Sequence, residues 1–531
     1  MIIEKTNRIR LFLSILSGAL LFLSFPKHGH PLAAWIAFVP LFYALSNKPT
    51  AGEGFKYGFI TGFVAYCGIL YWIAYVVVTY GYMPVYMGVL ALLLLASYLA
   101  LYMGIFAYAL VCLRRYGLRV IYTAPLIWVT LEYMKSTLLT GFPWANLGYS
   151  QFSFLPLIQI SDITGVYGLS FLIVLVNAAI FELIVHRKER TRVLVEPVVV
   201  FVLLLSVIFY GTWRIAEINS ILGRSPELPV TIVQGNIDQN VKWNPGYQQE
   251  TIRIYKTLSH AAQPKRNGLI VWPETATPFY FQEQGSLSQD VLDVARATGS
   301  WLVFGSPSYR KEAKEVLYFN SAFLVSPAGI VAGEYSKVQL VPYGEYVPLR
   351  KYFPFLSKIV VGVGDFTKGP GYLPIQASWG KAGVLICYEG IFSHAGTAYK
   401  KLGASFLINI TNDAWFGNTS APYQHLSMSA FRAVENRVYL LRAANTGISA
   451  IIEPTGAIAR QSKLFTPATV VGNVKYPSHA TTFYASHGDI FAFLCISVMV
   501  MYVISIFVIG RRRGYDRRIQ RDTGSHKKKD S

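Results

Sequence analysis

Eight apolar segments constrain this chain more strongly than any other feature of its sequence. Seven lie in the first 211 residues, and the eighth runs from about 490 to 509. A helix needs roughly 20 apolar residues to cross the hydrocarbon core of a bilayer. The pattern therefore predicts a multi-pass helical membrane domain with about eight spans, of which the second is short. The first seven segments are 11–25, 32–45, 59–78, 85–112, 120–138, 166–185 and 193–210.

Composition agrees with a membrane location. Hydrophobic residues make up 53% of the chain and charged residues 14%, which is too apolar for an ordinary soluble protein. The net charge of +20 could suggest nucleic acid, but the basic residues gather beside the apolar segments and at the C-terminus. No nucleic-acid-binding motif accompanies them. We therefore attribute the charge to membrane topology and expect no nucleic-acid partner.

The positions of the basic residues predict the orientation of the spans, because short cytoplasmic loops are rich in Lys and Arg. One set of loops is basic, while the opposite loops carry little beyond Lys27 and Lys135. Both termini are then expected in the cytoplasm and the long region between spans seven and eight outside, which in a bacterium is the periplasm. The first segment could be a cleaved leader, but no convincing cleavage site follows it. We expect a retained helix in a bacterial inner membrane.

This topology divides the chain into four parts. Residues 1–211 form the membrane domain, 212–487 a periplasmic domain, 488–510 a last transmembrane helix and 511–531 a basic cytoplasmic tail. The periplasmic part alternates short β-branched or aromatic runs with helical stretches, which is typical of an α/β domain. A hairpin pattern at 322–331 predicts a partly antiparallel sheet. The expected strands are 230–233, 268–271, 301–304 and 405–410, and the expected helices are 247–262 and 288–298.

Cys387 is the outstanding chemical feature of the periplasmic part. A buried strand, 383–386, ends there in Cys-Tyr-Glu-Gly, an arrangement suited to presenting a nucleophile. The other three cysteines lie in or beside apolar segments, so Cys387 has no disulfide partner in its own domain. A buried core cysteine is the alternative. A thiol with an ordinary pKa of about 8.5 needs a base or a cation to act as a thiolate, and Glu274 and Lys337 could supply both.

Three motifs in this order resemble the nitrilase, or carbon–nitrogen hydrolase, superfamily. They are Trp272-Pro273-Glu274, the run 337–348 and Ile386-Cys387-Tyr388-Glu389. That superfamily places a Glu-Lys-Cys triad on an α-β-β-α sandwich. With seven spans before this domain and one after it, the chain is similar to the membrane-embedded lipoprotein N-acyltransferases of the superfamily. The runs 411–417 and 432–437 fit the same resemblance.

The resemblance implies a role for each matching residue. Cys387 is the implied nucleophile, Glu274 the general base and Lys337 the cation that stabilises the oxyanion. Glu345 matches an additional glutamate and Glu389 a carboxylate beside the nucleophile, although each could be a structural ion-pair partner. The backbone N–H of Tyr388 is a candidate second oxyanion donor.

The implied reaction moves a fatty acyl chain in two steps. The donor is a phospholipid, typically phosphatidylethanolamine, and the chain passes through a cysteine thioester. It ends on the α-amine of a lipoprotein's diacylglyceryl-cysteine. No cofactor or metal is expected, since the sequence lacks His-Glu-x-x-His and a phosphate-binding loop, and we expect a monomer. The alternatives are a membrane-tethered amidase or nitrilase that uses water as acceptor, and a transporter or receptor with an inactive outer domain.

Several further residues are candidates for substrate contact. The basic and apolar segment 350–364 could be a lid with Phe353, Phe355 and Leu356 dipping into the bilayer, or an element packed in the core. Trp243 is a candidate for the same mouth. Asn412 and Trp415 suit either substrate shaping or turn chemistry. The aromatic loop 136–164 suits either the membrane interface or packing between helices.

Overall fold

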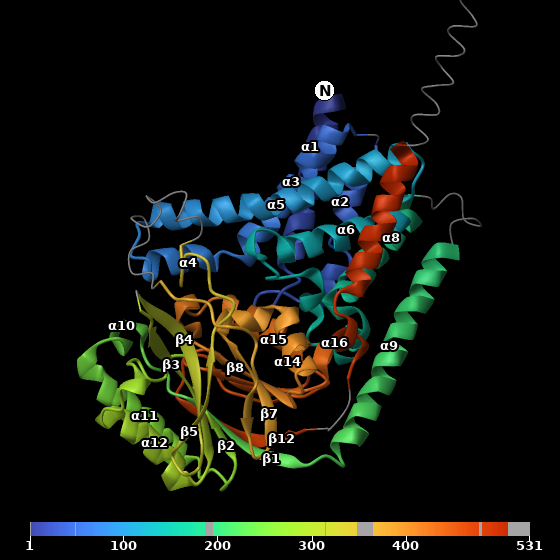
Figure 1. Ribbon diagram of the computed structural model, residues 1–531. Coiled ribbons are helices and arrows are strands. Elements are labelled where there is room, and N and C mark those ends of the chain that lie inside the picture. The colour runs from blue at the N-terminus through green and yellow to red at the C-terminus, as the bar shows by residue number, and fades with distance from the viewer. Residues whose placement is uncertain are drawn as a thin grey trace, which may run out of the picture.

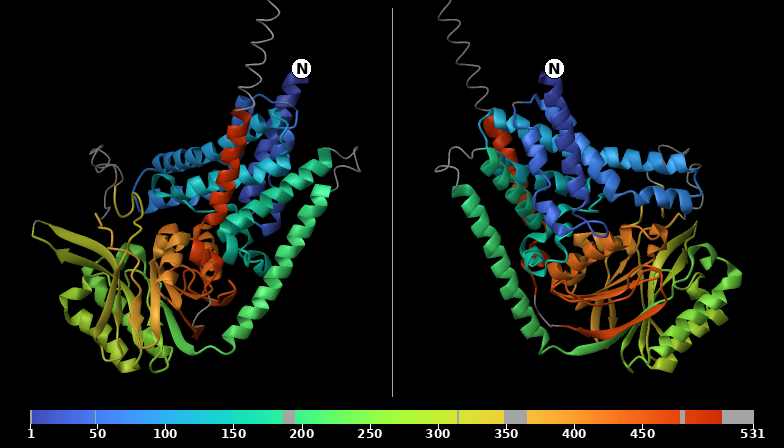
Figure 2. Two further views of the ribbon diagram at one scale, coloured as in Figure 1. Left: turned by 45° about the vertical axis from the view of Figure 1, so that its right-hand side comes forward. Right: turned by 180° about the vertical axis from the view of Figure 1, so that it is seen from behind.

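The computed structural model describes residues 2–47, 49–185, 195–313, 315–347, 365–476 and 481–507. A helical part and an α/β part lie side by side, with the α/β part on one side of the helices in every view (Figures 1 and 2). The main helices of the first part are α1 (Ile2–Phe22), α3 (Ala51–Ile69), α4 (Trp72–Thr79), α5 (Val85–Arg115), α6 (Val120–Thr137), α8 (Ser161–Val185), α9 (Val195–Leu222) and the unlabelled red helix Ile490–Phe507.

Two of the expected spans are wrong as continuous helices. The segment 32–45 forms a short 3-10 helix, Pro31–Trp35, and the six-residue α2 (Val39–Ala44), each with proline in its first turn. Six residues of helix rise only about 9 Å, far less than a bilayer core. The segment 59–78 is divided between α3 and α4, which are bent by 52°.

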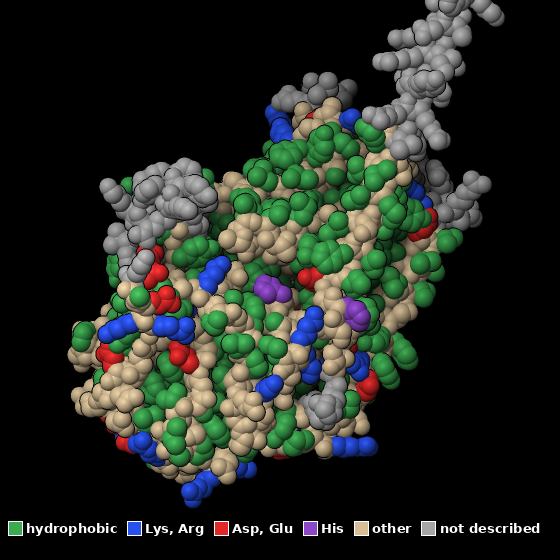
Figure 3. All heavy atoms as spheres, in the orientation of Figure 1, with side chains coloured by type: hydrophobic (Ala, Val, Ile, Leu, Met, Phe, Trp, Pro, Cys, Tyr) green, Lys and Arg blue, Asp and Glu red, His purple; other side chains and the backbone are tan. Residues whose placement is uncertain are grey.

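By length and composition, the described residues contain four candidate membrane spans, namely α5, α8, α9 and the helix Ile490–Phe507. The bent pair of α3 and α4 would make a fifth. This is fewer than the eight that the sequence predicts. Apolar side chains cover the upper part of the surface in Figure 3, whereas charged side chains lie mostly over the α/β part. Such an apolar belt suits contact with lipid.

The α/β part contains two six-stranded sheets. The first has the order β12-β1-β2-β3-β4-β5 and the second β11-β10-β9-β8-β7-β6. Parallel pairing in the middle of each sheet and antiparallel pairing at its edges confirm the predicted mixed sheet. The strands are β1 (Glu227–Gln234), β2 (Leu269–Val271), β3 (Trp301–Lys311), β4 (Val316–Val325), β5 (Val331–Ser336), β6 (Ile375–Ala377), β7 (Gly380–Ile386), β8 (Phe406–Thr411), β9 (Tyr439–Ala444), β10 (Ala450–Ile452), β11 (Ile458–Gln461) and β12 (Ala468–Lys475).

Helices cover the outer face of each sheet and complete an α-β-β-α sandwich, as predicted. α11 (Gln248–Ala261) and α12 (Ser286–Thr298) lie on the first sheet, and α14 (Ser393–Lys401) and α15 (Ala421–Asn436) on the second. α12 buries Val291, Val294 and Ala295 at helical spacing and ends at Gly299, whose φ of +62° suits glycine. Every residue of β8 is buried, as expected of a strand covered on both faces.

α15 packs between the second sheet and α8, where it also contacts the 3-10 helices Leu147–Gln151 and Cys387–Ile391. The aromatic loop packs at the junction between the two parts. Trp144 and Tyr149 are buried there, while Phe154 is half-exposed. The short helices are α7 (Leu155–Ile158), α10 (Gln239–Lys242), α16 (Phe483–His487) and the 3-10 helices Leu138–Thr140, Leu147–Gln151, Pro245–Tyr247, Phe281–Glu283, Cys387–Ile391 and Asp413–Phe416.

A buried polar cluster centred on Asp162 of α8 joins the two parts. Its carboxylate accepts hydrogen bonds from Arg437 Nη2 at 2.8 Å, Arg214 Nε at 2.9 Å and the Tyr210 hydroxyl at 2.8 Å. Arg437 comes from the sandwich, whereas Tyr210 and Arg214 come from α9. Arg437 is fully buried and Asp162 is 3% exposed on its side chain. The cluster therefore fixes the sandwich on α8 and α9 through charges that are shielded from water.

Replacing Asp162 by alanine should destabilise the joint strongly. Removing one partner of a buried ion pair typically costs about 3–5 kcal/mol, because the other charge stays buried and unpaired. We expect the unfolding temperature of the purified protein in detergent to fall by several degrees. Arg253→Ala, which breaks the exposed pair with Glu250, is the control and should leave that temperature unchanged. Equal unfolding temperatures for the two variants would contradict this assignment.

Candidate active site

Cys387 occupies a sharp turn at the end of β7. It is the first residue of the 3-10 helix Cys387–Ile391 and has a φ of +51°, a left-handed conformation that is uncommon for a residue with a side chain. Its side chain is half-buried. Such a turn places the sulfur atom at the strand end rather than in the sheet core. The alternative of an ordinary core cysteine does not account for this backbone geometry.

Glu274, Lys337 and Glu345 meet in one buried cluster. Glu274 follows β2, Lys337 follows β5, and Glu345 lies in the succeeding loop. The Lys337 ammonium lies 2.9 Å from a Glu345 carboxylate oxygen and 3.7 Å from a Glu274 oxygen. Lys337 is 1% exposed, so its charge depends on these two carboxylates. The structure thus brings together three side chains that are distant in sequence.

Hydrogen bonds hold both carboxylates in place. Asn320 Nδ2, from β4, donates to Glu274 Oε1 and to Glu345 Oε1, each at 2.8 Å. The backbone N–H of Asn412 donates to Glu274 Oε2 at 2.8 Å, and that of Val341 to Glu345 Oε2 at 2.8 Å. Both glutamates are therefore oriented by neutral donors as well as by the ammonium.

Burial and the neighbouring charges shift the pKa of the Cys387 thiol. Burial raises the pKa of Cys387, and the Glu274 carboxylate raises it further, while Lys337 opposes both effects. For Lys337 itself, burial lowers the pKa, but Glu345 and Glu274 outweigh burial and raise it. A thiol whose pKa is raised needs a base to take its proton before the sulfur can attack.

Glu389 is fully buried and ties two strand ends together. Its Oε1 accepts hydrogen bonds from the N–H groups of Val338 at 2.8 Å and Gln339 at 3.0 Å, and its Oε2 accepts one from Ile386 at 2.7 Å. The Tyr335 hydroxyl also donates, at 2.8 Å to Oε1. Burial raises the pKa of Glu389 to about 7, against the N–H groups of Ile386 and Gln339. Glu389 therefore fastens the residues next to Lys337 to those before Cys387.

The remaining predicted residues lie at different distances from the cluster. Asn412 belongs to the cluster, because its backbone N–H donates to Glu274. Its side-chain amide donates to Gln239 Oε1 at 2.7 Å. The Tyr388 ring packs edge-on against Phe392. Trp243 is 48% exposed and Trp415 is 39% exposed. The predicted lid residues Phe353, Phe355 and Leu356 lie outside the described residues.

Trp415 lies at the boundary with the membrane helices. Its ring packs edge-on against Tyr80, which follows α4, at 5.1 Å between centroids. The Tyr80 hydroxyl also donates to the Ala414 carbonyl at 2.9 Å. The loop that follows β8, and with it Asn412, is thus held against α4.

Sequence reasoning missed several residues around the site. Asn320 lies in an ordinary-looking strand, and no local motif marks it. Lys242 is fully buried and donates to the Glu274 carbonyl at 3.2 Å and to Thr275 Oγ1 at 2.6 Å, and burial lowers its pKa to about 8. His425 and Arg442 surround Asp413 in a buried group beneath Cys387. Their order along the chain gives no sign of these contacts.

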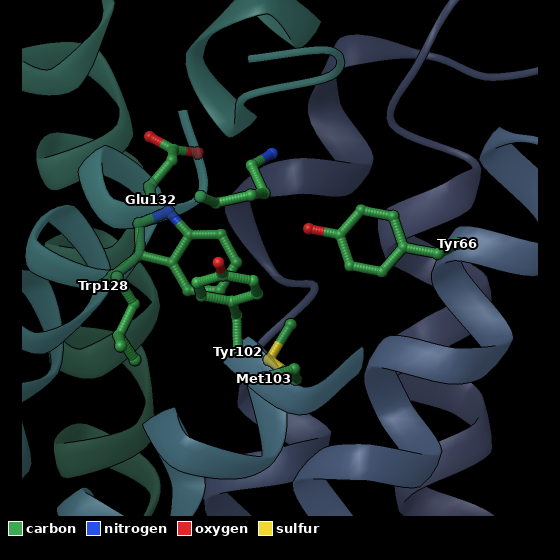
Figure 4. A pocket seen from close by; sticks show the side chains of 7 residues that line it. Tyr66, Tyr102, Met103, Trp128 and Glu132 are labelled. Atoms are coloured by element: carbon green, nitrogen blue, oxygen red, sulfur yellow. The ribbon is translucent and has the colours of Figure 1, made fainter. Parts of the chain in front are cut away.

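Side chains of α3, α5 and α6 line a pocket among the membrane helices (Figure 4). Lys135, at its edge, donates to the Trp144 carbonyl at 3.2 Å, and Glu132 accepts from the Leu147 N–H at 2.7 Å. These charged residues hold the loop against the sandwich, where Trp144 Nε1 donates to Gln424 at 2.7 Å. The pocket is lined by Tyr66, Tyr102, Met103, Trp128, Leu131, Glu132 and Lys135.

A sandwich of two helix-covered sheets, with carboxylate, ammonium and thiol at the ends of strands from both sheets, defines a protein of the nitrilase class. Family comparison agrees. A carbon–nitrogen hydrolase domain model matches residues 229–482, and a model of the N-terminal domain of apolipoprotein N-acyltransferase matches residues 17–179.

Relatives match across almost the whole length. Apolipoprotein N-acyltransferase of Geobacter metallireducens is 47% identical over 91% of this chain and 93% of its own. The proteins of the same name from Chlorobaculum tepidum and Haemophilus ducreyi are each 30% identical, over 92% and 91% of this chain and 94% of theirs. A solved amidase from Nesterenkonia sp. AN1 aligns with 49% of this chain and 96% of its own, at 21% identity and a TM-score of 0.36. The chain belongs to the apolipoprotein N-acyltransferase family, to which the relatives of that name also belong.

Replacing Glu389 by glutamine should loosen the strand ends that carry the site. The amide would direct an N–H group at backbone donors that now face an acceptor, and hydrogen bonds to a charged group are worth about 1.5–3 kcal/mol. We expect a lower unfolding temperature and slower alkylation of Cys387 by iodoacetamide. The control is Glu283→Gln, on the surface, which should change neither quantity. Unaltered alkylation in Glu389→Gln would show that this tether does not shape the site.

Proposed function

We propose that this chain transfers a fatty acyl chain from a membrane phospholipid to lipoproteins through a thioester on Cys387. The acceptor is the α-amine of the N-terminal diacylglyceryl-cysteine. The observation that carries this proposal is a buried cluster beside the membrane helices in which Lys337 meets Glu274. Glu389 ties the residue after Lys337 to the residue before Cys387, so the turn at Cys387 belongs to the same cluster. Family membership over nearly the whole chain supports the choice of substrates.

The first half-reaction forms the thioester. Glu274 takes the proton from the Cys387 sulfur, and the resulting thiolate attacks the ester carbonyl of the phospholipid. The Lys337 ammonium and the Tyr388 N–H stabilise the negative charge on the carbonyl oxygen. The intermediate then expels the glycerol oxygen, which takes the proton from Glu274 and leaves as a lysophospholipid.

The second half-reaction uses the same groups. Glu274 takes a proton from the attacking α-amine, and the same donors stabilise the second tetrahedral intermediate. Breakdown releases the thiolate and forms the amide, and the proton held by Glu274 returns to the sulfur. Three further residues hold these groups in place. Glu345 holds Lys337, Asn320 holds Glu274, and Glu389 holds the Cys387 turn. Such support suits a chemistry that depends on orientation.

The membrane location explains how both lipid substrates reach the sulfur. The chain is a membrane protein, and its site lies beside α4. We place it in a bacterial inner membrane with residues 212–487, which contain the sandwich, in the periplasm. They lie between the membrane domain 1–211 and the last helix 488–510, although α9 itself continues to Leu222. Both termini, including the tail 511–531, are cytoplasmic. The donor is phosphatidylethanolamine and the protein acts as a monomer. Trp243 and Trp415 border the entrance.

Hydrolysis is the less favoured candidate, because an amidase of the same triad needs no lipid substrate and no helices around its site. A transporter or receptor with an inactive domain would not need a strained turn at Cys387 beside a buried ammonium and a carboxylate.

The direct test follows the acyl group. Wild-type protein in detergent with a labelled phospholipid and a synthetic diacylglyceryl-cysteine peptide should yield lysophospholipid and N-acyl peptide. Without the peptide, mass spectrometry should find the acyl group on Cys387. Glu274→Gln should slow thioester formation by about 10²–10⁴-fold, as for a lost general base, and Lys337→Met by about 10²–10³-fold, as for a lost oxyanion donor. Cys387→Ala should form no thioester.

The surface variant Glu283→Gln is the matched control for Glu274→Gln and should transfer acyl groups at the wild-type rate. Free fatty acid as the sole product would favour hydrolysis. Full function of Cys387→Ala would refute the proposal and favour the transporter or receptor.

A further inference from the structure

The backbone carbonyl of Cys387 is held by two buried side chains that play no part in the proposed chemistry. His425 Nε2, from α15, lies 3.2 Å from this oxygen, and Asn409 Nδ2, from β8, lies 3.4 Å from it. Both side chains are fully buried. A carbonyl oxygen only accepts hydrogen bonds, so His425 Nε2 carries a hydrogen whether the ring is neutral or charged.

A third residue fixes the two donors. Arg442 Nη1 donates to Asn409 Oδ1, and Arg442 Nη2 lies 3.0 Å from His425 Nδ1 and donates to Asp413 Oδ2 at 2.6 Å. Trp144 and Phe416 pack against the imidazole ring at centroid distances of 5.7 Å and 6.3 Å. His425 therefore has little freedom to rotate away from the Cys387 carbonyl.

His425 is not available as a base. Its Nε2 is committed as a donor to the carbonyl, and its Nδ1 faces Asp413 and Arg442. No lone pair on the ring is left to accept a proton from substrate. Any contribution to the reaction must pass through the backbone that it holds.

The peptide bond between Cys387 and Tyr388 is planar, so the hydrogen bonds to the Cys387 carbonyl also set the direction of the Tyr388 N–H. In a trans peptide the N–H points opposite to the C=O of the same plane. Holding the Cys387 oxygen on the side of His425 and Asn409 directs the Tyr388 N–H to the opposite side, away from β8 and α15. This N–H lies in the first turn of a 3-10 helix, where it has no partner within the helix.

We propose that His425 is a positioning residue, which with Asn409 fixes the Cys387–Tyr388 peptide so that the Tyr388 N–H faces the oxyanion. This inference rests on the proposed acyl transfer, because it assigns the second oxyanion donor of that reaction. It also explains why a fully buried polar cluster stands directly beneath the nucleophile.

Two substitutions at His425 separate this role from simple packing. The amide nitrogen of glutamine can take the place of Nε2, whereas asparagine reaches only the place of Nδ1. His425→Asn should therefore keep a polar group near Asp413 and Arg442 but lose the contact with the Cys387 carbonyl. His425→Gln should restore that contact. His260→Asn, an exposed histidine on α11, is the matched control.

The decisive measurement compares acyl transfer with alkylation of the same sulfur. Alkylation by iodoacetamide passes through no oxyanion, whereas thioester formation does. We expect His425→Asn to lower the kcat of lysophospholipid release by about 10–100-fold, part of the 10²–10³-fold typical of a lost oxyanion donor. Its KM and its alkylation rate should stay within about threefold of wild type. His425→Gln should recover most of kcat.

Two results would overturn the inference. Equal kcat values for His425→Asn, His425→Gln and wild type would show that the contact is irrelevant. A parallel fall in transfer and alkylation would show that His425 places the sulfur itself rather than the N–H. The same comparison of acylation with alkylation can be made with a p-nitrophenyl fatty ester, which acylates Cys387 without any phospholipid. Turnover of this ester without phospholipid turnover would count against the proposed donor alone.

Discussion

The site depends on the ion pairs that the buried ammonium of Lys337 makes with Glu345 and Glu274. Almost no water reaches it, so its charge is sustained by Glu345 and Glu274. These groups come from the end of β5, the following loop and the end of β2, and they can meet only if the first sheet forms in its observed order. Loss of both carboxylates would leave an uncompensated charge in the interior. The same ammonium serves the proposed reaction, because a fixed cation in a dry site stabilises a developing oxyanion more than it would in water.

Much of this site could be predicted from sequence because its key groups follow strands directly. A strand pattern ending in Glu274, Lys337 or Cys387 is local information. The strands concerned, β2, β5 and β7, are not adjacent to one another, and the packing of the two sheets brings their ends together. The α/β class and the positions of α11 and α12 were predictable for the same reason. Asn320, His425 and Arg442 were not, since their partners lie far away in sequence and their own segments look like ordinary strands or helices. The roles of all these residues remain predictions for experiment.

The membrane part was harder to predict from the sequence than the site. Hydrophobicity identified where the helices lie but not their continuity. The short pieces between Pro31 and Ala44 each carry proline in their first turn, which interrupts a longer helix. After Ile69 the chain bends by 52° between two apolar helices. Buried polar residues of the same region, including Glu132 and Lys135, bond backbone groups of the aromatic loop. Charges that look unfavourable for a span are therefore used to shape the surface on which the sandwich rests.

The cluster at Asp162 has a mechanical consequence. The Asp162 carboxylate receives hydrogen bonds from the sandwich and from α9, so neither can swing without breaking a bond to α8. The height of the sulfur above its own helices is then set inside the protein rather than by lipid. A thicker or thinner bilayer would change the tilt of the whole molecule. It would leave unchanged the distance between Cys387 and the membrane helices.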